Sequence, residues 1–394
     1  MISVEEALSA LFALVRPLQA EEVPLGRAHG RVLARDVVAR RTQPPFAASA
    51  MDGYAVADGA ARPGARFAVI GESAAGHRFA GSVGAGQAVR IFTGAPLPEG
   101  ADRVIIQEDV DRDGDTIVLH DDLDAGSHVR PAGADFTAGT PMGAPRLLGP
   151  NDIALLAAMN VATLPVTRKP VVAIIATGDE LVQPGEDPGP DQIIASNSHG
   201  LAALVAQHGA APRLLPIARD NHDSLALAFR LAADADLIVT IGGASVGDHD
   251  LVGQTAQDFG LERAFHKIAM RPGKPLMMGR LHGKPFLGLP GNPVSAMVCG
   301  HLFLLPMLRA LLGQRDVLPR IVTARLIRAL PGNGPRAHYM RATLAEDATG
   351  RTVTAADRQD SALLTVLAQA NALLIRPVGD PALPEGATVA TIPL

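Results

Sequence analysis

Residues 170–313 alternate short apolar segments with helical patterns, and no other feature limits the possible folds as strongly. Segments 171–175 and 237–241 contain almost no polar residue that could face water, as expected for strands buried on both faces of a sheet. Three further strand-like segments lie at 214–217, 276–278 and 285–289. This alternation predicts a doubly wound, mostly parallel α/β sheet with right-handed crossovers.

The length and composition of the chain exclude several classes of protein. Its 394 residues are too many for one compact core and predict about two to four domains. The net charge of −5 and the lack of tryptophan argue against nucleic acid or an anionic membrane as a partner. An anionic substrate would therefore need a local basic cluster.

Cysteine content and apolar stretches bear on the cellular compartment. Cys299 is the only cysteine, so an intramolecular disulfide and a multi-cysteine metal site are excluded, and its apolar surroundings predict a buried side chain. The longest apolar stretch, 302–312, contains Pro306 and Arg309 and is expected to be too short to cross a bilayer. With no signal peptide apparent either, we expect a cytoplasmic protein.

Changes in pattern along the chain indicate the domain boundaries. Ser3 and Glu6 form a capping box for a helix within residues 1–22, which should pack on the α/β domain or at a dimer interface. Short strands and glycine-rich turns predict a mainly β insert domain at 46–141. The expected multidomain α/β fold is completed by a small discontinuous linking domain at 23–45 and 142–169, the α/β domain at 170–316 and a C-terminal β domain at 317–394.

Polar residues in front of helical patterns mark the expected helix starts. Asn151 should cap one helix, Ser196 or Asn197 a second, and Ser224 should start a third. The second of these helices should end at Gly209.

Acidic residues follow three successive strands of the predicted sheet. Asp179 and Glu180 come after the first strand, Asp220 after the second, and Asp248 and Asp250 after the third. Because the carboxyl ends of parallel strands meet at one edge, these acids should share a rim and could hold a ligand or a hard cation. The alternative is structural, with Asp179 or Asp248 merely capping a helix.

Glycines and basic residues near these acids suit an anion. Gly242 and Gly243 let the backbone approach a ligand and leave N–H groups free to donate to it. A single histidine between Asp248 and Asp250 favours Mg²⁺ over a transition metal. Arg271 and Lys274 stand in a proline-containing turn that suits an oxyanion or phosphate, although an isolated turn of this kind is more often a solvated surface feature. The turn at 289–295, which contains Asn292, opens a helix with free N–H groups.

Seven segments, in order along the chain, resemble motifs of the molybdopterin molybdenumtransferase family, called MoeA in bacteria and found as the E domain of gephyrin. The segments are SAMDGYAV (49–56), FTGAPLPEGAD (92–102), IIQE (105–108), TGDEL (177–181), GGASVGDHD (242–250), MRPGKP (270–275) and GLPGNPVSAMV (288–298). Each is unspecific alone, but the ordered set is specific, and the resemblance covers essentially the full chain.

The resemblance implies an activity that residue patterns alone do not name. Such proteins insert molybdenum from molybdate into molybdopterin, using the adenylylated pterin as substrate, and release AMP as molybdenum cofactor forms. It also implies a molybdopterin-binding role for residues 170–316, Mg²⁺ as cofactor, and an elongated homodimer whose cleft combines both chains. Molybdopterin adenylyltransferase and molybdoenzyme chaperones are further partners that it suggests.

The resemblance also assigns roles to individual positions. The implied catalytic residues are Asp52, Thr93, Glu180, Asp220 and Asp250. Molybdate would contact Ser245, Arg271, Lys274, Pro275, Arg341 and Ser361. The pterin and its phosphate would contact Thr177, Gly178, Asp179, Asn197, Gly242, Gly243 and Asn292. The implied Mg²⁺ ligands are Asp220, Asp248 and Asp250.

Two positions depart from the family pattern, and two other functions compete. The family commonly has Lys where Arg271 stands, which changes donor geometry, and often Gly where Asp360 stands, which places an acid beside the expected dianion. An adenylyltransferase-type nucleotide enzyme would use a similar α/β domain but not the SAMDGYAV segment. A non-enzymatic scaffold is the third hypothesis, and the chain shows no fused domain or long linker that would favour it.

Overall fold

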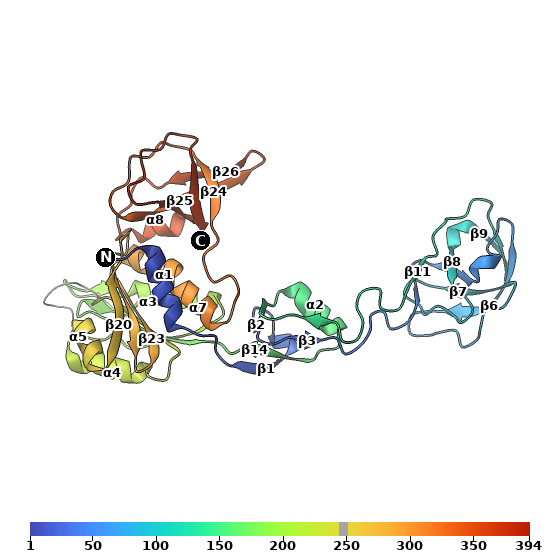
Figure 1. Cartoon of the computed structure of the whole chain (residues 1–394), viewed down its shortest axis with the longest axis horizontal. Helices are drawn as coiled ribbons and strands as arrows, with labels where there is room; N and C mark the ends of the chain where they lie inside the picture. The colour runs from blue at the N-terminus through green and yellow to red at the C-terminus, as the bar shows by residue number, and fades with distance from the viewer. Residues whose placement is uncertain (244–250) are drawn as a thin grey trace.

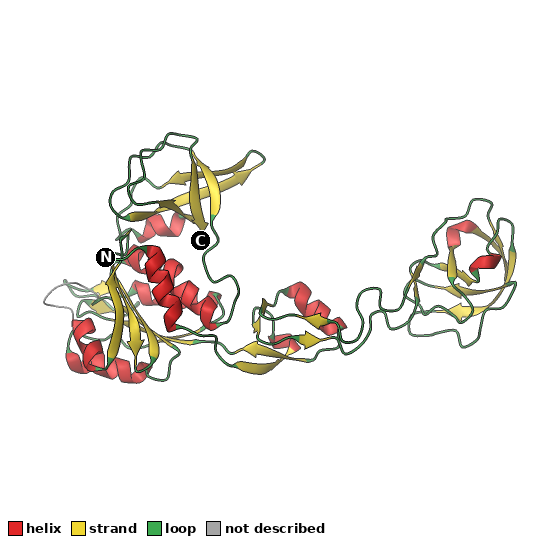
Figure 2. Ribbon diagram, in the orientation of Figure 1, coloured by secondary structure: helices red, strands yellow, loops and turns green. Residues whose placement is uncertain are grey.

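The computed structural model describes residues 1–243 and 251–394 and shows an elongated molecule (Figure 1). The α/β domain and a C-terminal β domain lie together at one end, and a small domain with α2 (Pro150–Ala158) lies in the middle. A separate β domain occupies the far end (Figure 2). The multidomain α/β fold predicted from the sequence is confirmed.

A six-stranded sheet in the order β18-β15-β19-β23-β22-β20 forms the α/β domain. Its four parallel strands are β18 (Ala211–Leu214), β15 (Val171–Ala176), β19 (Leu237–Ile241) and β23 (Lys284–Leu289). Antiparallel pairing adds β22 (Pro275–Leu281) next to β23 and β20 (Leu261–Lys267) next to β22. The apolar runs form the central strands because only these positions are covered on both faces.

Helices bury both faces of this sheet. One core contains α1 (Val4–Leu14), α3 (Ser196–Gln207), α6 (Pro293–Cys299) and α7 (Leu305–Leu311), with Leu11 and Leu201 fully buried. The other core contains α4 (His222–Ala232) and α5 (Leu251–Asp258). The capping box at Ser3 and Glu6 is present, with the Glu6 N–H donating to Ser3 Oγ at 3.0 Å.

The helix starts differ from those predicted. Gly149, not Asn151, is the N-cap of α2, and its N–H donates to Asp152 Oδ2 at 2.8 Å. Ala195 precedes α3, so Asn197 lies inside the first turn. Asn221 caps α4 by accepting a hydrogen bond from the Ser224 N–H at 2.9 Å, because its side-chain oxygen reaches the donor three residues on.

The strand predicted at 214–217 is also displaced. It ends at Leu214, and its ladder with β15 is interrupted there before one further parallel bridge joins Ala218 to Thr177. Pro216 offers no N–H to a ladder, which accounts for the interruption between Leu214 and Ala218. The remaining polar chain from Ala218 onward then crosses the carboxyl edge of the sheet.

Two domains lie outward from the α/β domain. The middle domain pairs β1 (Ala20–Pro24), β14 (Thr163–Thr167), β2 (Val32–Leu33) and β13 (Arg146–Leu147). The far domain has the strand order β8-β5-β7-β6-β10-β9. These strands are β8 (Arg103–Ile106), β5 (Gly53–Val56), β7 (Gln87–Ile91), β6 (Arg66–Ser73), β10 (Thr116–Leu119) and β9 (Val110–Asp113).

The C-terminal domain is a closed sheet that includes a piece of the α/β domain. Its strands are β24 (Val322–Leu326), β25 (Ala337–Asp347), β26 (Gly350–Ala355), β27 (Ala372–Arg376) and β28 (Thr388–Pro393). Pairing of β27 with β25 closes the barrel. The short strand β21 (Met270–Arg271) pairs in parallel with β25, so the basic turn is attached directly to this barrel.

One helical segment is longer than its sequence suggested. Pro293–Leu311 forms a continuous apolar helix of 19 residues, long enough to cross a membrane by length and composition. Most of it is buried in the α/β core, where Cys299 is fully enclosed, and burial raises the pKa of that thiol. The segment is therefore a core helix of this domain.

Candidate functional site

A cavity of about 630 Å³ lies at the carboxyl edge of the α/β sheet. It opens where β15, β19 and β23 end, which is the edge at which sheets of this kind bind ligands. The candidate residues that line it are Thr177, Gly178, Glu180, Asn197, Asp220, Gly242, Gly243, Pro275 and Asn292. The structure thus brings together residues that are more than a hundred positions apart.

Acidic side chains meet at the rim of this cavity. The Asp220 N–H donates to Asp179 Oδ1 at 3.1 Å, which joins the first two strand ends. Partial burial raises the pKa of Asp220, and the neighbouring Asp179 and Glu180 carboxylates raise it further. No helix starts at Asp179, so the interpretation of this residue as a helix cap is wrong.

Arg219 links the loop that contains Asp220 to the loop that contains Asp179. The sequence analysis did not identify it as a site residue. Its Nη1 donates to the carbonyl oxygens of Asp179 at 2.9 Å and Leu181 at 3.2 Å. Its own N–H donates to Ser224 Oγ at 2.9 Å. An arginine directly before a rim acid was the available signal, but sequence does not show which carbonyls it reaches.

The cavity wall includes a glycine turn that packs too closely for any other residue. Gly242 and Gly243 have φ of 96° and 62°, values that side-chain-bearing residues rarely adopt. A Cβ on Gly243 would lie 2.0 Å from Val252 Cγ2, and one on Gly242 would lie 2.8 Å from the Thr177 carbonyl oxygen. Only glycine therefore fits where this turn passes between β15 and α5.

The C-terminal domain reaches the cavity through the N-terminus of α6. The Val294 N–H donates to the Ser361 carbonyl oxygen at 3.0 Å, and Ala362 lines the cavity. On the other side, Asn197 Nδ2 donates to the Gly291 carbonyl at 2.7 Å. These contacts show how a segment far along the chain comes to border the α/β site.

Arg341 is a buried cation at this junction. Its side chain is fully enclosed, Nη2 donates to the Asp360 carbonyl at 3.1 Å, and Nε and Nη1 have no partner among the described residues. Burial lowers the pKa of Arg341, as does Arg271, whereas Asp360 acts in the opposite direction. The Asp360 carboxylate accepts from the Ala362 N–H, which uses one of its oxygens locally.

Other candidate residues lie apart from the cavity lining. Arg271 and Lys274 are exposed on the turn that joins the two domains. Asp52 and Thr93 lie in the far β domain, distant from the cavity within one chain (Figure 1). There Asp52 Oδ1 accepts from the Thr93 N–H at 2.7 Å and Oγ1 at 2.8 Å, and these bonds lower the pKa of Asp52.

Ser245, Asp248 and Asp250 lie outside the described residues. Within the described ranges there is no group of three side chains that could hold a metal by itself. The mutual repulsion at Asp220 nevertheless fits a hard cation, because Mg²⁺ needs only one or two carboxylates when phosphate oxygens and water complete its shell. The Mg²⁺ ligands that the resemblance implies are Asp220, Asp248 and Asp250, and of these Asp220 lies in the described part of the chain.

The fold and cavity define a multidomain protein whose α/β domain has a cavity at the carboxyl edge of its sheet. Three family descriptions match consecutive parts of the chain: the MoeA N-terminal region (domains I and II) over 2–160, the probable molybdopterin-binding domain over 173–310, and the MoeA C-terminal region (domain IV) over 323–394. The chain belongs to the MoeA family.

Sequence similarity to individual relatives extends over nearly the full length of this chain. A molybdopterin molybdenumtransferase of Nostoc is 36% identical over 410 aligned positions, covering 100% of this chain and 94% of the relative. Molybdopterin molybdenumtransferase 2 of Mycobacterium tuberculosis is 37% identical, with 95% of each chain covered. The crystal structure of a molybdopterin biosynthesis MoeA protein from Pyrococcus horikoshii superposes with a TM-score of 0.86 at 31% identity, covering 100% of this chain and 99% of that one.

Proposed function

We propose that this protein inserts molybdenum from molybdate into adenylylated molybdopterin, releasing AMP and forming molybdenum cofactor. The observation that supports this proposal most strongly is a cavity lined by acidic rim residues, by a glycine turn and by Ala362 of the C-terminal domain. Buried Arg341 belongs to the same domain junction. The full-length similarity to molybdopterin molybdenumtransferases supports this reaction over other uses of an α/β domain.

The acidic rim is the place for the phosphoanhydride. Bound Mg²⁺ would neutralise phosphate charge as the bond to AMP breaks. Asp220 and Glu180 orient the phosphate end of the substrate, and Arg219 keeps their loops in register. The Gly242 N–H is not free as the sequence predicted, because it donates to the Leu289 carbonyl at 3.0 Å, so the contribution of the glycine turn is to let a phosphate approach the backbone closely.

Buried Arg341 is the anchor for molybdate. A guanidinium with two unpartnered nitrogens supplies directional donors to a dianion, and its burial strengthens that attraction. Ser361, Pro275, Lys274 and Arg271 border the same junction of the two domains. The protein contributes positioning and charge, because sulfur atoms of the pterin bind the metal.

The far β domain contributes through a homodimer. Asp52 and Thr93 are too distant to serve the cavity of their own chain, so a second copy would bring them to it (Figure 1). The Asp52 carboxylate, kept ionised by Thr93, would close the cleft from the opposite side.

Mixing inactive variants tests this arrangement. Co-refolded Asp52→Ala and Asp220→Asn chains should recover about a quarter of wild-type turnover, since half the dimers carry one intact composite site. Mixing Glu180→Gln with Asp220→Asn is the matched control and should recover nothing. If Asp52 acts within its own chain, the first mixture stays as inactive as the second.

Purified protein with adenylylated molybdopterin, molybdate and Mg²⁺ tests the reaction itself. Release of AMP together with molybdenum cofactor supports insertion. Synthesis of the adenylylated pterin from ATP would favour the adenylyltransferase hypothesis, and no turnover of either substrate would favour a scaffold. A cytoplasmic location, with molybdopterin adenylyltransferase and molybdoenzyme chaperones as transient partners, accords with this role.

A further inference from the structure

Three separate loops of the far β domain meet at Asp52. The first loop contains Asp52 itself and leads into β5. The second follows β7 and contains Thr93, whose N–H and hydroxyl donate to the Asp52 carboxylate. The third begins with η3 (Gln107–Asp109) after β8, and the Gln107 N–H donates to the Asp52 carbonyl oxygen at 3.1 Å. The position of Asp52 therefore depends on how these three loops are fixed relative to one another.

Arg90, on β7, forms hydrogen bonds with two of these loops. Its Nη1 donates at 3.3 Å to the carbonyl oxygen of Gly53, the residue directly after Asp52. Its Nη2 donates to the Gln107 side-chain oxygen at 2.7 Å, in the loop after β8. A guanidinium suits this arrangement because its planar set of donors can reach two acceptors in a fixed geometry.

Two aromatic rings pack against the same guanidinium. The Arg90 Cζ lies 5.1 Å from the centre of the Tyr54 ring and 4.7 Å from the centre of the Phe92 ring. Both distances lie within the range of cation–π attraction. Tyr54 is opposite Arg90 in the ladder between β5 and β7 and is almost fully buried. Because Phe92 directly precedes Thr93, Arg90 also contacts the second loop and thus touches all three.

The charge of Arg90 acts on Asp52 as well. Hydrogen bonds from Thr93 are the main reason for the lowered pKa of Asp52, and burial opposes them. The nearby guanidinium lowers this pKa further. Its two Nη atoms donate to Gly53 and Gln107 rather than to the carboxylate, so Arg90 acts through the loops and through space.

We propose that Arg90 is a positioning residue that fixes the Asp52 carboxylate for its part in molybdenum insertion. The inference rests on the proposed function of Asp52 in the composite site. Loss of Arg90 would let the loops that carry Asp52, Thr93 and Gln107 move independently. Misplacement of a reacting group by about 1 Å can lower turnover about 100-fold, so a side chain that never contacts the substrate can still control the rate.

Arg103 provides a matched control in the same sheet. It pairs with Val56, at the end of β5 away from Asp52. Like Arg90, it bonds two groups through its Nη atoms, the Asp58 carboxylate and the Asp124 carbonyl. Its side chain is mostly buried. Substitution of Arg103 should therefore lower the stability of the domain without affecting the loops around Asp52.

Steady-state kinetics of full-length variants give the first test. Arg90→Met keeps an apolar side chain against the two rings but removes the charge and both donors. Its kcat should fall about tenfold while KM for adenylylated molybdopterin stays within about twofold, because Arg90 acts through Asp52 and not on the substrate. Arg90→Lys keeps the charge but loses the fixed pair of donors, so kcat should still fall at least about fivefold. Arg103→Met should leave both constants within about twofold for the folded fraction.

Two NMR measurements follow Asp52 directly and require no turnover. The ¹³C carboxyl signal of Asp52, assigned by its loss in Asp52→Asn, should titrate with a higher pKa in Arg90→Met than in wild type. Amide exchange of Thr93 should accelerate at least about fivefold in Arg90→Met, because the loop that donates to Asp52 is released. Neither measurement should change in Arg103→Met.

The outcomes separate this inference from the proposed function. Unchanged Asp52 titration and Thr93 exchange in folded Arg90→Met would overturn the positioning role, and so would wild-type kcat in Arg90→Lys. Equal changes in Arg103→Met would also overturn it, because they would follow from lost stability alone. If Arg90→Met does not fold, Thr93 exchange in Arg90→Lys decides the question. Absence of AMP release by the wild-type protein would contradict the proposed function, while the two NMR measurements would still test Arg90.

Discussion

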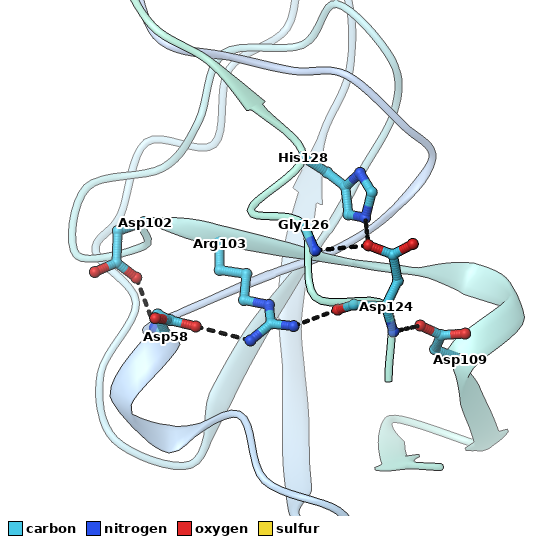
Figure 3. A network of polar contacts seen from close by, with 7 residues as sticks. All are labelled: Asp58, Asp102, Arg103, Asp109, Asp124, Gly126 and His128. Atoms are coloured by element: carbon cyan, nitrogen blue, oxygen red, sulfur yellow. Dashed lines mark hydrogen bonds and ion pairs between the residues drawn. The ribbon is translucent and has the colours of Figure 1, made fainter. Parts of the chain in front are cut away.

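Acidic residues at the two ends of this molecule have opposite surroundings. In the far β domain, Arg103 lies between two acids: Nη1 donates to Asp58 Oδ1 at 2.9 Å, and Nη2 donates to the Asp124 carbonyl (Figure 3). The Asp124 carboxylate accepts from the Gly126 N–H at 2.6 Å and contacts His128 Nε2 at 2.9 Å. Each acid here has a local donor.

The acids at the α/β rim repel one another instead. Burial and the charges of Asp179 and Glu180 raise the pKa of Asp220, whereas the Gly126 N–H is the main reason for the lowered pKa of Asp124. A carboxylate already satisfied by its own chain stabilises a fold, and a carboxylate held near like charges is available to a cation. The comparison favours a functional role for the rim acids and a structural role for the Asp124 network.

Asp220→Asn should have the largest effect. Removing the charge should lower turnover at least about 100-fold, because the cation and phosphate lose their central carboxylate. The midpoint of thermal unfolding should stay equal or rise slightly at pH 7. A raised folded-state pKa means that ionisation costs stability as pH rises, and exposure to solvent keeps this gain below about 1 kcal/mol.

The control for this change is a nearby acid outside the cavity. Asp223→Asn, on the first turn of α4, should retain turnover within about twofold. Calorimetry with Mg²⁺ alone should show weaker binding to Asp220→Asn than to Asp223→Asn. Equal Mg²⁺ affinity and equal turnover of the two variants would show that Asp220 has no functional role that Asp223 lacks.

Asp236→Asn should show what a paired acid contributes. Burial alone would raise the pKa of Asp236, but donors on Arg168 and the Val171 N–H outweigh it, so the pKa is lowered. Arg168 Nη1 donates to Asp236 Oδ2 at 2.7 Å at the entry to the α/β sheet. The substitution leaves a half-buried guanidinium unpaired and should lower the free energy of unfolding by about 2 kcal/mol at pH 7.

The pH dependence gives the sign of this effect. A depressed folded-state pKa contributes stability above the unfolded value near pH 4, and this contribution is lost as pH falls through the folded value. Denaturant titrations of wild type and variant should therefore converge in acid. Asp234→Asn, which affects an exposed pair with Arg213, is the control and should show a much smaller difference. A difference in the free energy of unfolding between wild type and Asp236→Asn that persists at low pH would contradict the role of the Asp236 charge.

The sequence revealed the rim acids because strand order is readable from apolar runs. Asp179 and Asp220 each follow such a run, and parallel strands bring their ends to one edge. The same reasoning could not find Arg219, whose acceptors are backbone carbonyls. Nor could it find a second cavity, of about 500 Å³, which Arg271, His338 and Arg376 line in the C-terminal domain. That cavity depends on β21 joining a barrel that begins about fifty residues later, and such pairing leaves no local pattern in the chain.

Helix starts were less predictable for a local reason. Several polar residues in a row can each cap a helix, and the choice depends on which side-chain oxygen reaches a free N–H. In α4 the side-chain oxygen of Asn221 accepts from the Ser224 N–H, so Asn221 is the N-cap. In α2 the Asp152 carboxylate, inside the helix, accepts from the Gly149 N–H. Errors of two or three residues at these ends did not move the acids from the rim.

Asp124→Ala should have the smallest effect and completes the comparison. The change removes the acceptor for the Gly126 N–H and the contact with His128, so this loop should open more often. Amide exchange of Gly126 should accelerate about tenfold at neutral pH, with turnover unchanged within about twofold. Because the pKa of Asp124 is lowered, wild-type protection of Gly126 should itself fade in acid as the carboxylate protonates. Asp122→Ala, an exposed acid two positions earlier, should leave Gly126 protected. If Asp124→Ala instead lowered turnover as far as Asp220→Asn does, local satisfaction by N–H donors would no longer separate structural acids from functional ones.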